Sequence, residues 1–361
     1  MKHFQLKSLL AAVIALSLLS ACNKDKVTPN PIDPVQTTDR AGVYVLSQGG
    51  ITLNNSTLSF YNYATKTTTA DIFAAANSRG LGDTGNDAKI YGSKMYITVN
   101  YSSTIEVVEA KTAKSIKQIK MGEGANKRQP RFVVFNKNKA YISSYDGTVA
   151  VLDTATLTID KYITVGRNPE QMVVSNGKLY VANSGGLDFS NIDHTVSVIN
   201  LATGTEIKKI DIVDTNPIDI AADAYGDVYV ISYGTDFPSH PKLTIINNTT
   251  DVVKKTTDID AGYGTSFVIN GDMAYYLTDA GKVKVYNVKT DVVATESFIT
   301  GGATIVVPYA IAVDPLTGEV FVTDAVDYRN NGKLFAFDKT GKFEYTIATG
   351  INPGAIVLVN K

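Results

Sequence analysis

Cysteine, histidine and serine motifs are the first features that could indicate chemistry in this sequence of 361 residues. It contains one cysteine and three histidines, and we find neither a cysteine nucleophile nor histidines paired at metal-ligand spacing. No Gly-x-Ser-x-Gly motif occurs. Residues 80–85 read Gly-Leu-Gly-Asp-Thr-Gly, but no helix is expected after them to hold a phosphate. We therefore predict that the protein is not an enzyme and has no catalytic residue, resident metal or cofactor.

Tyrosine and arginine are the other side chains that could form a site. The chain has 20 tyrosines, no tryptophan and a net charge of −1, without the basic stripe that nucleic-acid binding needs. Tyrosine is a rigid plate with a polar tip, and both residue types contribute strongly to binding, so they suit a large, partly polar ligand. We predict the following ligand-binding residues: Asn100, Tyr101, Arg128, Arg131, Tyr145, Arg167, Asn183, Phe189, Tyr233, Phe237, Tyr263, Tyr309 and Tyr328.

Two short strand patterns recur and indicate which elements must position these residues. The first pattern is apolar-aromatic-apolar, and its seven copies are centred on Tyr44, Tyr96, Tyr141, Tyr180, Tyr229, Tyr275 and Phe321. The second begins with Thr or Lys, continues with apolar positions and ends in Asn, Asp or Glu. Its copies are Thr57–Asn62, Thr104–Glu109, Thr148–Asp153, Thr195–Asn200, Lys242–Asn247, Lys282–Asn287 and Lys333–Asp338.

The two patterns alternate strictly, with a mean period of about 46 residues. A unit of this length with four strands is typical of a β-propeller, whereas a β-sandwich or β-helix does not explain the period. Tight turns such as Asn176-Gly177-Lys178 precede the aromatic strand, and turns capped by Asx and Thr side chains follow the second pattern. We predict an all-β, seven-bladed propeller over residues 42–361, with four antiparallel strands per blade.

Ring closure can also be predicted from the two ends of this domain. The chain enters at Gly42 on a second strand and ends with residues 354–359 as a first strand. Pairing the C-terminal strand with the first N-terminal strand completes one blade and removes two open edges.

Insertions gather on one face of the predicted propeller. The connections between second and third strands, and the crossings between blades, vary in length, while the other turns stay short. The predicted ligand-binding residues lie in these variable connections or at their edges, as do five of the six arginines; the sixth, Arg40, is expected in the tether. Variable loops confined to one face usually mark the binding face of a repeat protein.

One enzymatic alternative remains open. Asp87, Glu170 and Asp219 occur where inner strands begin, and a ring of their carboxylates would suit calcium, as in propeller lactonases. Arg131 and Tyr309 begin equivalent strands and would place a cation and a ring in the same layer, which disfavours this metal-dependent hydrolysis.

The N-terminus is typical of an exported protein. A basic start precedes the apolar stretch 9–19, which is shorter than the roughly 20 residues that span a bilayer and suits a signal peptide over residues 1–21. Leu19-Ser20-Ala21-Cys22 resembles the bacterial lipobox, which implies lipid attachment at Cys22. The proline-rich polar residues that follow, within 22–41, predict a tether.

Several segments resemble the YncE-like propeller lipoproteins of Bacteroidota: residues 81–97, Gln129-Pro130-Arg131, Tyr145-Asp146-Gly147, 166–171 and 179–186. Tyr180-Val181-Ala182-Asn183 is also similar to the Tyr-Val-Thr-Asn repeat of prokaryotic surface propellers. One branch of these lipoproteins captures cobalamin at the cell surface and passes it to a TonB-dependent outer-membrane transporter. The resemblance implies an outer-membrane, lipid-anchored, surface-exposed protein that binds cobalamin or a related corrinoid and partners such a transporter.

Two other functions stay open beside corrinoid capture. A surface adhesion or scaffold propeller would bind a protein or a glycan through the same loops, and the hydrolase would need the carboxylate ring. In the corrinoid hypothesis, loop aromatics meet the broad corrin plane, and Arg128, Arg131 and Arg167 meet its amides and phosphate.

Overall fold

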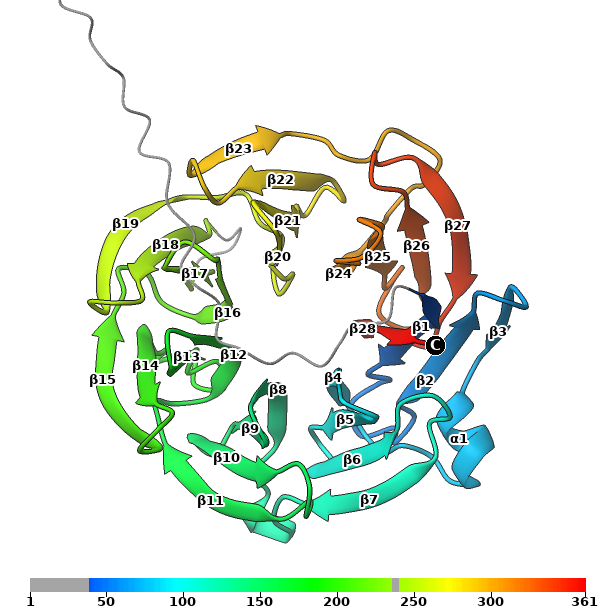
Figure 1. Cartoon of the computed structure of the whole chain (residues 1–361), viewed down its shortest axis with the longest axis horizontal. Helices are drawn as coiled ribbons and strands as arrows, with labels where there is room; N and C mark the ends of the chain where they lie inside the picture. Colours follow the sequence, from blue (N-terminus) through cyan, green and yellow to red (C-terminus); the bar gives the residue numbers. More distant parts are fainter. Residues whose placement is uncertain (1–38, 236–239) are drawn as a thin grey trace, which may run out of the picture.

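The computed structural model describes residues 39–235 and 240–361, which form seven four-stranded antiparallel sheets arranged as the blades of a closed propeller (Figure 1). From the innermost to the outermost strand, blades 1 to 3 are β28 (Pro353–Asn360), β1 (Arg40–Ser47), β2 (Thr57–Asn62), β3 (Thr67–Thr69); β4 (Gly85–Tyr91), β5 (Lys94–Val99), β6 (Thr104–Glu109), β7 (Ser115–Lys120); and β8 (Pro130–Asn136), β9 (Lys139–Ser144), β10 (Thr148–Asp153), β11 (Ile159–Thr164).

Blades 4 to 7 follow the same order: β12 (Pro169–Ser175), β13 (Lys178–Asn183), β14 (Thr195–Asn200), β15 (Thr205–Asp211); β16 (Pro217–Ala222), β17 (Asp227–Ser232), β18 (Lys242–Asn247), β19 (Val252–Asp258); β20 (Val268–Asn270), β21 (Met273–Leu277), β22 (Val283–Asn287), β23 (Val292–Thr295); and β24 (Pro308–Val313), β25 (Val320–Asp324), β26 (Lys333–Phe337), β27 (Phe343–Ala348). A short helix α1 (Ile72–Asn77) and a 3-10 turn η1 (Gly124–Asn126) lie in blade crossings. The predicted fold is confirmed.

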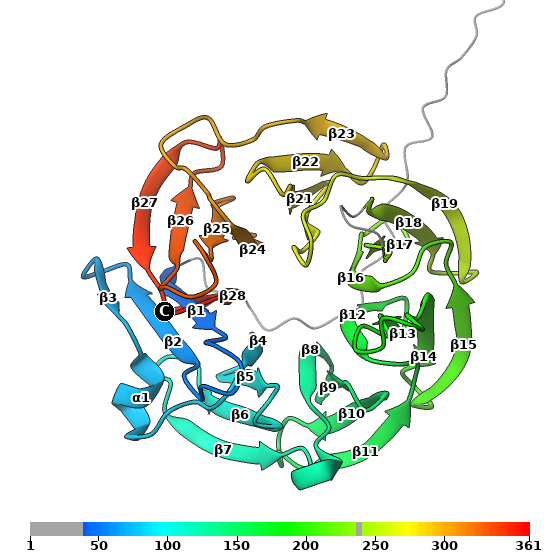
Figure 2. The ribbon, with the colours of Figure 1, turned by 180° about the vertical axis from the view of Figure 1, so that it is seen from behind.

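The ring closes as predicted, because β28 pairs with β1 along most of both strands. Both views show these strands side by side with the C-terminus beside them (Figures 1 and 2). Arg40, expected in the tether, instead begins β1. Its guanidinium donates to both carboxylate oxygens of Asp314, at 3.0 and 2.6 Å, and both side chains are buried. This ion pair links the first strand of the chain to blade 7.

The hydrophobic core is divided into seven apolar clusters, one between each pair of neighbouring blades. The recurring aromatic residue of the second strand lies in these clusters, which explains its repetition. Several of its hydroxyls also bridge blades: Tyr96 donates to the Thr154 carbonyl, Tyr180 to Asn248 and Tyr229 to Val288. A tyrosine therefore supplies both apolar area and an inter-blade hydrogen bond, as buried tyrosines usually require.

The turns between third and fourth strands are closed by their own side chains. The Asn200 side-chain oxygen accepts from the N–H groups of Ala202 and Thr203, at 2.9 and 3.2 Å. The same arrangement recurs after β2, β10, β18 and β22, through Asn62, Asp153, Asn247 and Asn287. After β26, Asp338 accepts from the N–H groups of Thr340 and Lys342. The predicted Asx-capped turns are confirmed in these six blades.

The predicted signal peptide 1–21, the lipid-attachment residue Cys22 and the tether up to residue 38 lie outside the described residues. Within the part of the chain that the structure describes, no helix is long and apolar enough to cross a membrane.

Candidate functional site

The strand order places the connections on two opposite faces. The side that carries the connections between second and third strands and the blade crossings is called the loop face. The opposite side, which carries the remaining turns, is called the turn face. Each predicted ligand-binding residue within the described ranges lies on the loop face or at a strand end that meets it. Phe237 lies outside the described residues.

Inner strands lie around the centre of the ring and begin on the loop face (Figure 1), and we call the ring of their first residues the mouth of the channel. A residue with positive φ precedes the starting proline in several blades: Gln129 (φ 54°), Asn168 (42°), Asn216 (60°) and Asn352 (56°). The register then shifts just after the proline, for example between Pro130 and Val133 in β8. Such a bulge re-aims the side chains that it contains. It carries Arg131 in β8 and the equivalent Glu170 in β12.

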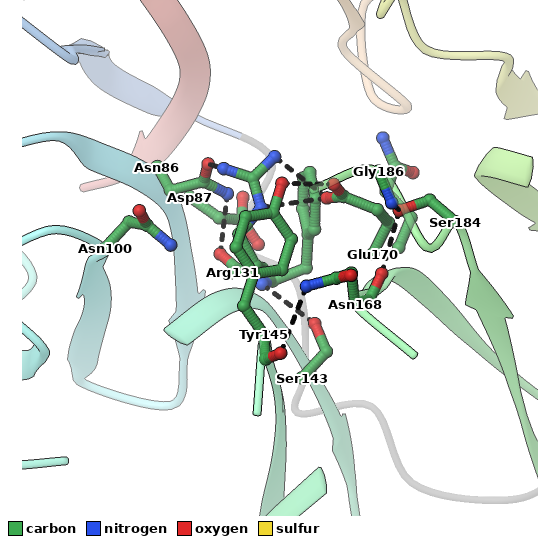
Figure 3. Close-up of polar contacts among 12 residues, drawn as sticks. Asn86, Asp87, Asn100, Arg131, Ser143, Tyr145, Asn168, Glu170, Ser184 and Gly186 are labelled. Carbon is green, nitrogen blue, oxygen red and sulfur yellow. Dashed lines mark hydrogen bonds and ion pairs between the residues drawn. The ribbon is translucent and has the colours of Figure 1, made fainter. Parts of the chain in front are cut away.

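Arg131, Glu170 and Tyr145 meet in the mouth of the channel (Figure 3). Arg131 donates from Nε to Glu170 Oε2 at 2.9 Å, and its Nη2 lies 2.8 Å from the same oxygen. The Tyr145 hydroxyl donates to Glu170 Oε1 at 2.5 Å, and the guanidinium lies 4.7 Å from the centre of its ring. Arg131 also donates to the side-chain oxygen of Asn86. These four residues form what we call the floor.

Burial, together with the charge of Glu170, sets the ionisation of Arg131 and Tyr145 in the floor. It acts to lower the pKa of Arg131, but the carboxylate of Glu170 outweighs it, and the pKa of Arg131 lies above its ordinary value. Burial first, and then the charge of Glu170, raise the pKa of Tyr145. At neutral pH, Arg131 is therefore a cation and Tyr145 a neutral hydrogen-bond donor.

Further polar contacts surround the floor from other blades. The Tyr309 hydroxyl donates to the Gln48 side-chain oxygen at 2.9 Å, and the Tyr309 ring packs edge-on against Tyr328, with centroids 6.1 Å apart. Burial raises the pKa of Tyr309 to about 12, with a smaller opposing contribution from Arg131 across the mouth. Gln171 donates to the hydroxyl of Ser266 at 3.1 Å, which links blade 4 to the start of blade 6. The mouth is thus lined by polar groups from most of the ring.

Exposed apolar side chains also lie in the loop-face connections. Phe189 is 81% exposed, and it belongs to a set on loop-face connections that we call the rim: Ile51, Leu53, Tyr101, Leu187, Phe189, Val213, Tyr263, Val306 and Tyr328. In the turn-face connections that the structure describes, Leu316 is the one exposed large apolar side chain, and Val252 and Val292 are exposed where β19 and β23 begin beside two of these turns. Apolar groups concentrated on one face in this way mark an interaction surface.

The arginines of the loop face are not free cations. Arg128 is ion-paired with Asp146 and lies over the ring of Tyr162 at 3.8 Å. Arg167 is half-exposed and lies near two carboxylates, at 3.6 Å from Asp188 and 3.8 Å from Asp193. The three arginines expected to meet a phosphate therefore each have an acidic partner already.

Three residues of the predicted set are buried and serve the fold. Asn183 bonds the Thr195 and Ser197 hydroxyls, each at 3.0 Å, and Tyr233 donates to the Gly262 carbonyl at 2.9 Å. Asn100 donates to the Gln129 carbonyl at 3.2 Å. Their side chains lie beneath the loops, so their proposed contact with a ligand stays a prediction that would need the loops to move. Arg131, Tyr145 and Tyr309 lie at the mouth itself, and Tyr101, Phe189, Tyr263 and Tyr328 lie on the rim.

The carboxylates proposed for calcium do not form a ring. Asp87 accepts from the Val133 N–H at 3.0 Å and Asp219 from the Phe267 N–H at 2.6 Å, so both tie one blade to the next. Burial raises the pKa of Asp219 to about 7. Glu170 is held by Arg131 and Tyr145. Across residues 39–235 and 240–361, no three His, Cys, Asp or Glu side chains are grouped so that they could hold a metal ion.

A family profile described as domain of unknown function DUF5074 matches residues 41–348. The chain belongs to the DUF5074 family. No curated protein matches the chain. Among solved structures it is similar to Kuenenia stuttgartiensis hydrazine synthase, with 15% identity, a TM-score of 0.62 and coverage of 76% of this chain and 89% of that chain.

Two other structures extend this likeness. A quinonprotein alcohol dehydrogenase-like protein from Bacteroides thetaiotaomicron is 18% identical, with a TM-score of 0.60 and coverage of 89% of this chain and 79% of that one. The computationally designed protein Ika8 is 13% identical, with a TM-score of 0.56 and coverage of 88% and 96%. At these identities the likeness shows the propeller fold and nothing about activity.

The floor also contains residues that sequence reasoning did not assign to a binding site. The sequence analysis assigns Glu170 only to a calcium site and predicts no role for Asn86; it also predicts none for Gln48, which contacts Tyr309 beside the floor. The repeat itself carried the missing signal, because Arg131 and Glu170 both follow the proline that begins an inner strand in successive blades. Equivalent positions in neighbouring blades of a ring lie side by side, so an ion pair between them could have been predicted.

Proposed function

We propose that this DUF5074 protein is a binding protein that holds one large ligand on its loop face, and that the ligand is cobalamin or a related corrinoid. The observation that carries the proposal is the combination of a neutral, hydrogen-bonding floor with an apolar rim on the same face. Ligand sites commonly pair apolar walls with a few placed polar groups. A corrinoid presents a broad apolar ring system edged with amides, which matches both parts.

The proposal includes the setting of this binding. Lipid attachment at Cys22 after signal-peptide removal would anchor the propeller to the outer membrane through the polar tether, with the domain exposed at the cell surface. A TonB-dependent transporter is the proposed partner that receives the corrinoid. The basis for this setting is the N-terminal sequence and its resemblance to surface lipoproteins. No catalytic step is proposed, because the floor residues hold one another in ion pairs and hydrogen bonds.

Isothermal titration calorimetry of the purified protein with cyanocobalamin tests the proposal. We expect one-to-one binding, weakened roughly 10-fold or more by the double substitution Tyr145→Ala and Arg167→Ala, because Tyr145 belongs to the floor and Arg167 is half-exposed on the loop face. Leu316→Ala, which removes an exposed apolar side chain on the turn face, is the matched control and should leave the affinity unchanged. An absence of heat at micromolar protein would contradict corrinoid binding.

A second candidate is a surface scaffold that binds a protein or a glycan. The rim favours it, because exposed Leu, Ile, Val and Phe side chains are what a protein partner would cover. Genome context separates the two functions, since a corrinoid-capturing protein should be encoded beside a transporter barrel. Binding of cyanocobalamin that is insensitive to loop-face substitutions would also favour this second reading.

A further inference from the structure

The floor is neutral overall but still has hydrogen-bonding capacity. An arginine carries five N–H donors and a carboxylate can accept about four hydrogen bonds. The contacts of Arg131 with Glu170 and Asn86 use three of those donors, on Nε, Nη2 and Nη1. Glu170 accepts from Tyr145 on Oε1 and from Arg131 on Oε2. Two donors of Arg131 and one acceptor position of Glu170 therefore remain.

Both side chains of the Arg131–Glu170 pair keep some access to solvent. The Arg131 side chain is 18% exposed and the Glu170 side chain 5%, so a larger fraction of Arg131 is accessible. The ring of Tyr145 lies against the guanidinium, and its hydroxyl holds Glu170. Asn168 donates to the Tyr145 carbonyl at 3.1 Å and supports this loop (Figure 3). The floor is thus pre-organised before any ligand arrives, which lowers the cost of binding.

We propose that the floor recognises a primary carboxamide and rejects the corresponding carboxylate. A carboxamide oxygen can accept from the free donors of Arg131 while its NH₂ donates to Glu170, so both charges gain a partner. A carboxylate can accept from Arg131, but it brings a second negative charge beside Glu170 and has no donor to offer it. An ammonium group can donate to Glu170, but it brings a second positive charge beside Arg131 and has no acceptor to offer it. Buried groups left unpaired in this way are the usual source of strong discrimination.

This inference rests on the proposed function for its ligand scaffold, because the corrin edge carries several primary carboxamides. The donor and acceptor pattern rests on Arg131, Glu170 and Tyr145 alone. For Arg131 it favours an amide over a phosphate among the groups expected to meet the arginines, since the charge of Arg131 is already balanced by Glu170.

The test compares cyanocobalamin with its separate monocarboxylic acids, each with one peripheral carboxamide hydrolysed, by calorimetry at pH 7.5. At this pH the acids are ionised. We expect at least one of them to bind the wild-type protein roughly 10-fold or more weakly than the parent. Glu170→Gln leaves Arg131 as an uncompensated cation, so in this variant the same acid should bind as well as the parent or better. Equal affinities in the wild type, or unchanged discrimination in Glu170→Gln, would overturn the inference.

Glu106→Gln is the matched control. Glu106 is also buried and ion-paired with an arginine, Arg79, at 2.8 Å, but it lies in outer strand β6 rather than at the mouth. This variant should keep the discrimination of the wild type. Tyr145→Phe serves as the second test variant, because it keeps the ring while returning one acceptor position to Glu170, and it should reject the acid at least as strongly as the wild type.

A second arm without a corrin ring separates the inference from the proposed function. Nicotinamide and nicotinic acid differ only in the amide and acid group, and their weak binding can be followed by ligand-observed NMR. We expect nicotinamide to bind the wild type in preference to nicotinate, and Glu170→Gln to reverse that preference. If no corrinoid binds but this preference appears, corrinoid capture fails and carboxamide recognition stands. If the wild type prefers neither cyanocobalamin to its monocarboxylic acids nor nicotinamide to nicotinate, carboxamide recognition fails, even if cyanocobalamin itself binds.

Discussion

The two faces of the propeller differ in the length of their connections and in the side chains that those connections expose. On the turn face, Asn and Asp side chains cap the backbone of their own turn, as Asn200 does. On the loop face, charged side chains bind one another or a neighbouring blade, as Arg131 and Glu170 do. The described loop-face connections expose nine large apolar side chains, whereas the described turn-face connections expose one, Leu316.

This contrast suggests that stability and binding are assigned to different faces. Short capped turns leave few backbone groups without a hydrogen-bond partner, so they connect neighbouring strands at little cost in free energy. The loops carry exposed Phe, Tyr and Leu side chains that contribute little to stability where they stand, because they remain in water. Substitutions on the two faces should therefore separate unfolding from ligand binding.

The largest effect is expected at the ring closure on the turn face. Asp314→Ala leaves the buried guanidinium of Arg40 without its bidentate partner and should lower the free energy of unfolding by about 3–5 kcal/mol. Denaturant unfolding measures this loss. The control, Glu123→Ala, removes an exposed ion pair with Lys120 and should leave the transition midpoint unchanged. A loss of ligand affinity in folded Asp314→Ala would contradict the separation of the faces.

The next effect is a pH dependence at the mouth. Burial raises the folded-state pKa of Asp219 to about 7, above the unfolded value near 3.9. A raised pKa gives stability that is present below about pH 4 and is lost as the pH rises through 7. In Asp219→Asn the free energy of unfolding should fall less as the pH rises. At pH 8 this variant should be more stable than the wild type by about 1–3 kcal/mol, measured by denaturant unfolding. Equal pH profiles for both proteins would contradict the shifted pKa.

Asp314 on the turn face should show the opposite sign. Burial acts to raise its pKa, but hydrogen bonds from Arg40 and the Leu316 N–H outweigh burial and hold the pKa below its ordinary value. Its stabilising contribution is therefore present above about pH 4 and lost as the pH falls through the lowered pKa. In Asp314→Asn, the acid limb of the stability profile should be shallower than in the wild type. A profile that is steeper on the acid side would contradict this assignment.

A smaller effect is expected at the rim. Phe189→Ala removes a highly exposed ring and should leave the free energy of unfolding within about 0.5 kcal/mol of the wild type. It should weaken cyanocobalamin binding by about 1–2 kcal/mol, measured by calorimetry, because aromatic side chains dominate binding surfaces. Unchanged affinity would remove Phe189 from the site.

The smallest effect is expected in a single turn. Asn200→Ala removes two hydrogen bonds to the backbone of its turn and should lower the free energy of unfolding by about 1 kcal/mol. Its affinity for cyanocobalamin should equal that of the wild type. The two variants test the separation of the faces together. Phe189→Ala should weaken binding and leave stability unchanged, whereas Asn200→Ala should lower stability and leave binding unchanged.

The fold could be predicted from the sequence because the repeat encodes it twice, in the aromatic strand and in the Thr- or Lys-started strand. Five of the seven predicted copies of the second pattern coincide with observed strands, and the other two differ by one residue at one end. The helix α1 was not predicted, although Asp71 caps it by accepting from the Ala74 N–H. One short turn of helix leaves little periodicity in a sequence.

The site could be predicted only in part. Strand order fixes which connections share a face, so residues such as Tyr145 and Phe189 could be assigned to it. Burial within a loop depends on how that loop folds back, and the pattern around Asn183 and Tyr233 does not encode this. The pairing of Arg131 with Glu170 depends on the bulges of two different blades. Single-blade patterns do not contain that relation.

Hydrogen–deuterium exchange of the full chain with and without saturating cyanocobalamin tests the central claim most directly. We predict slower exchange in loop-face segments, including 184–194, 259–267 and 325–332, and unchanged exchange in turn-face segments such as 154–158, 201–204 and 338–342. Protection confined to the turn face, or no protection anywhere, would contradict the claim that this propeller binds a corrinoid through its loop face.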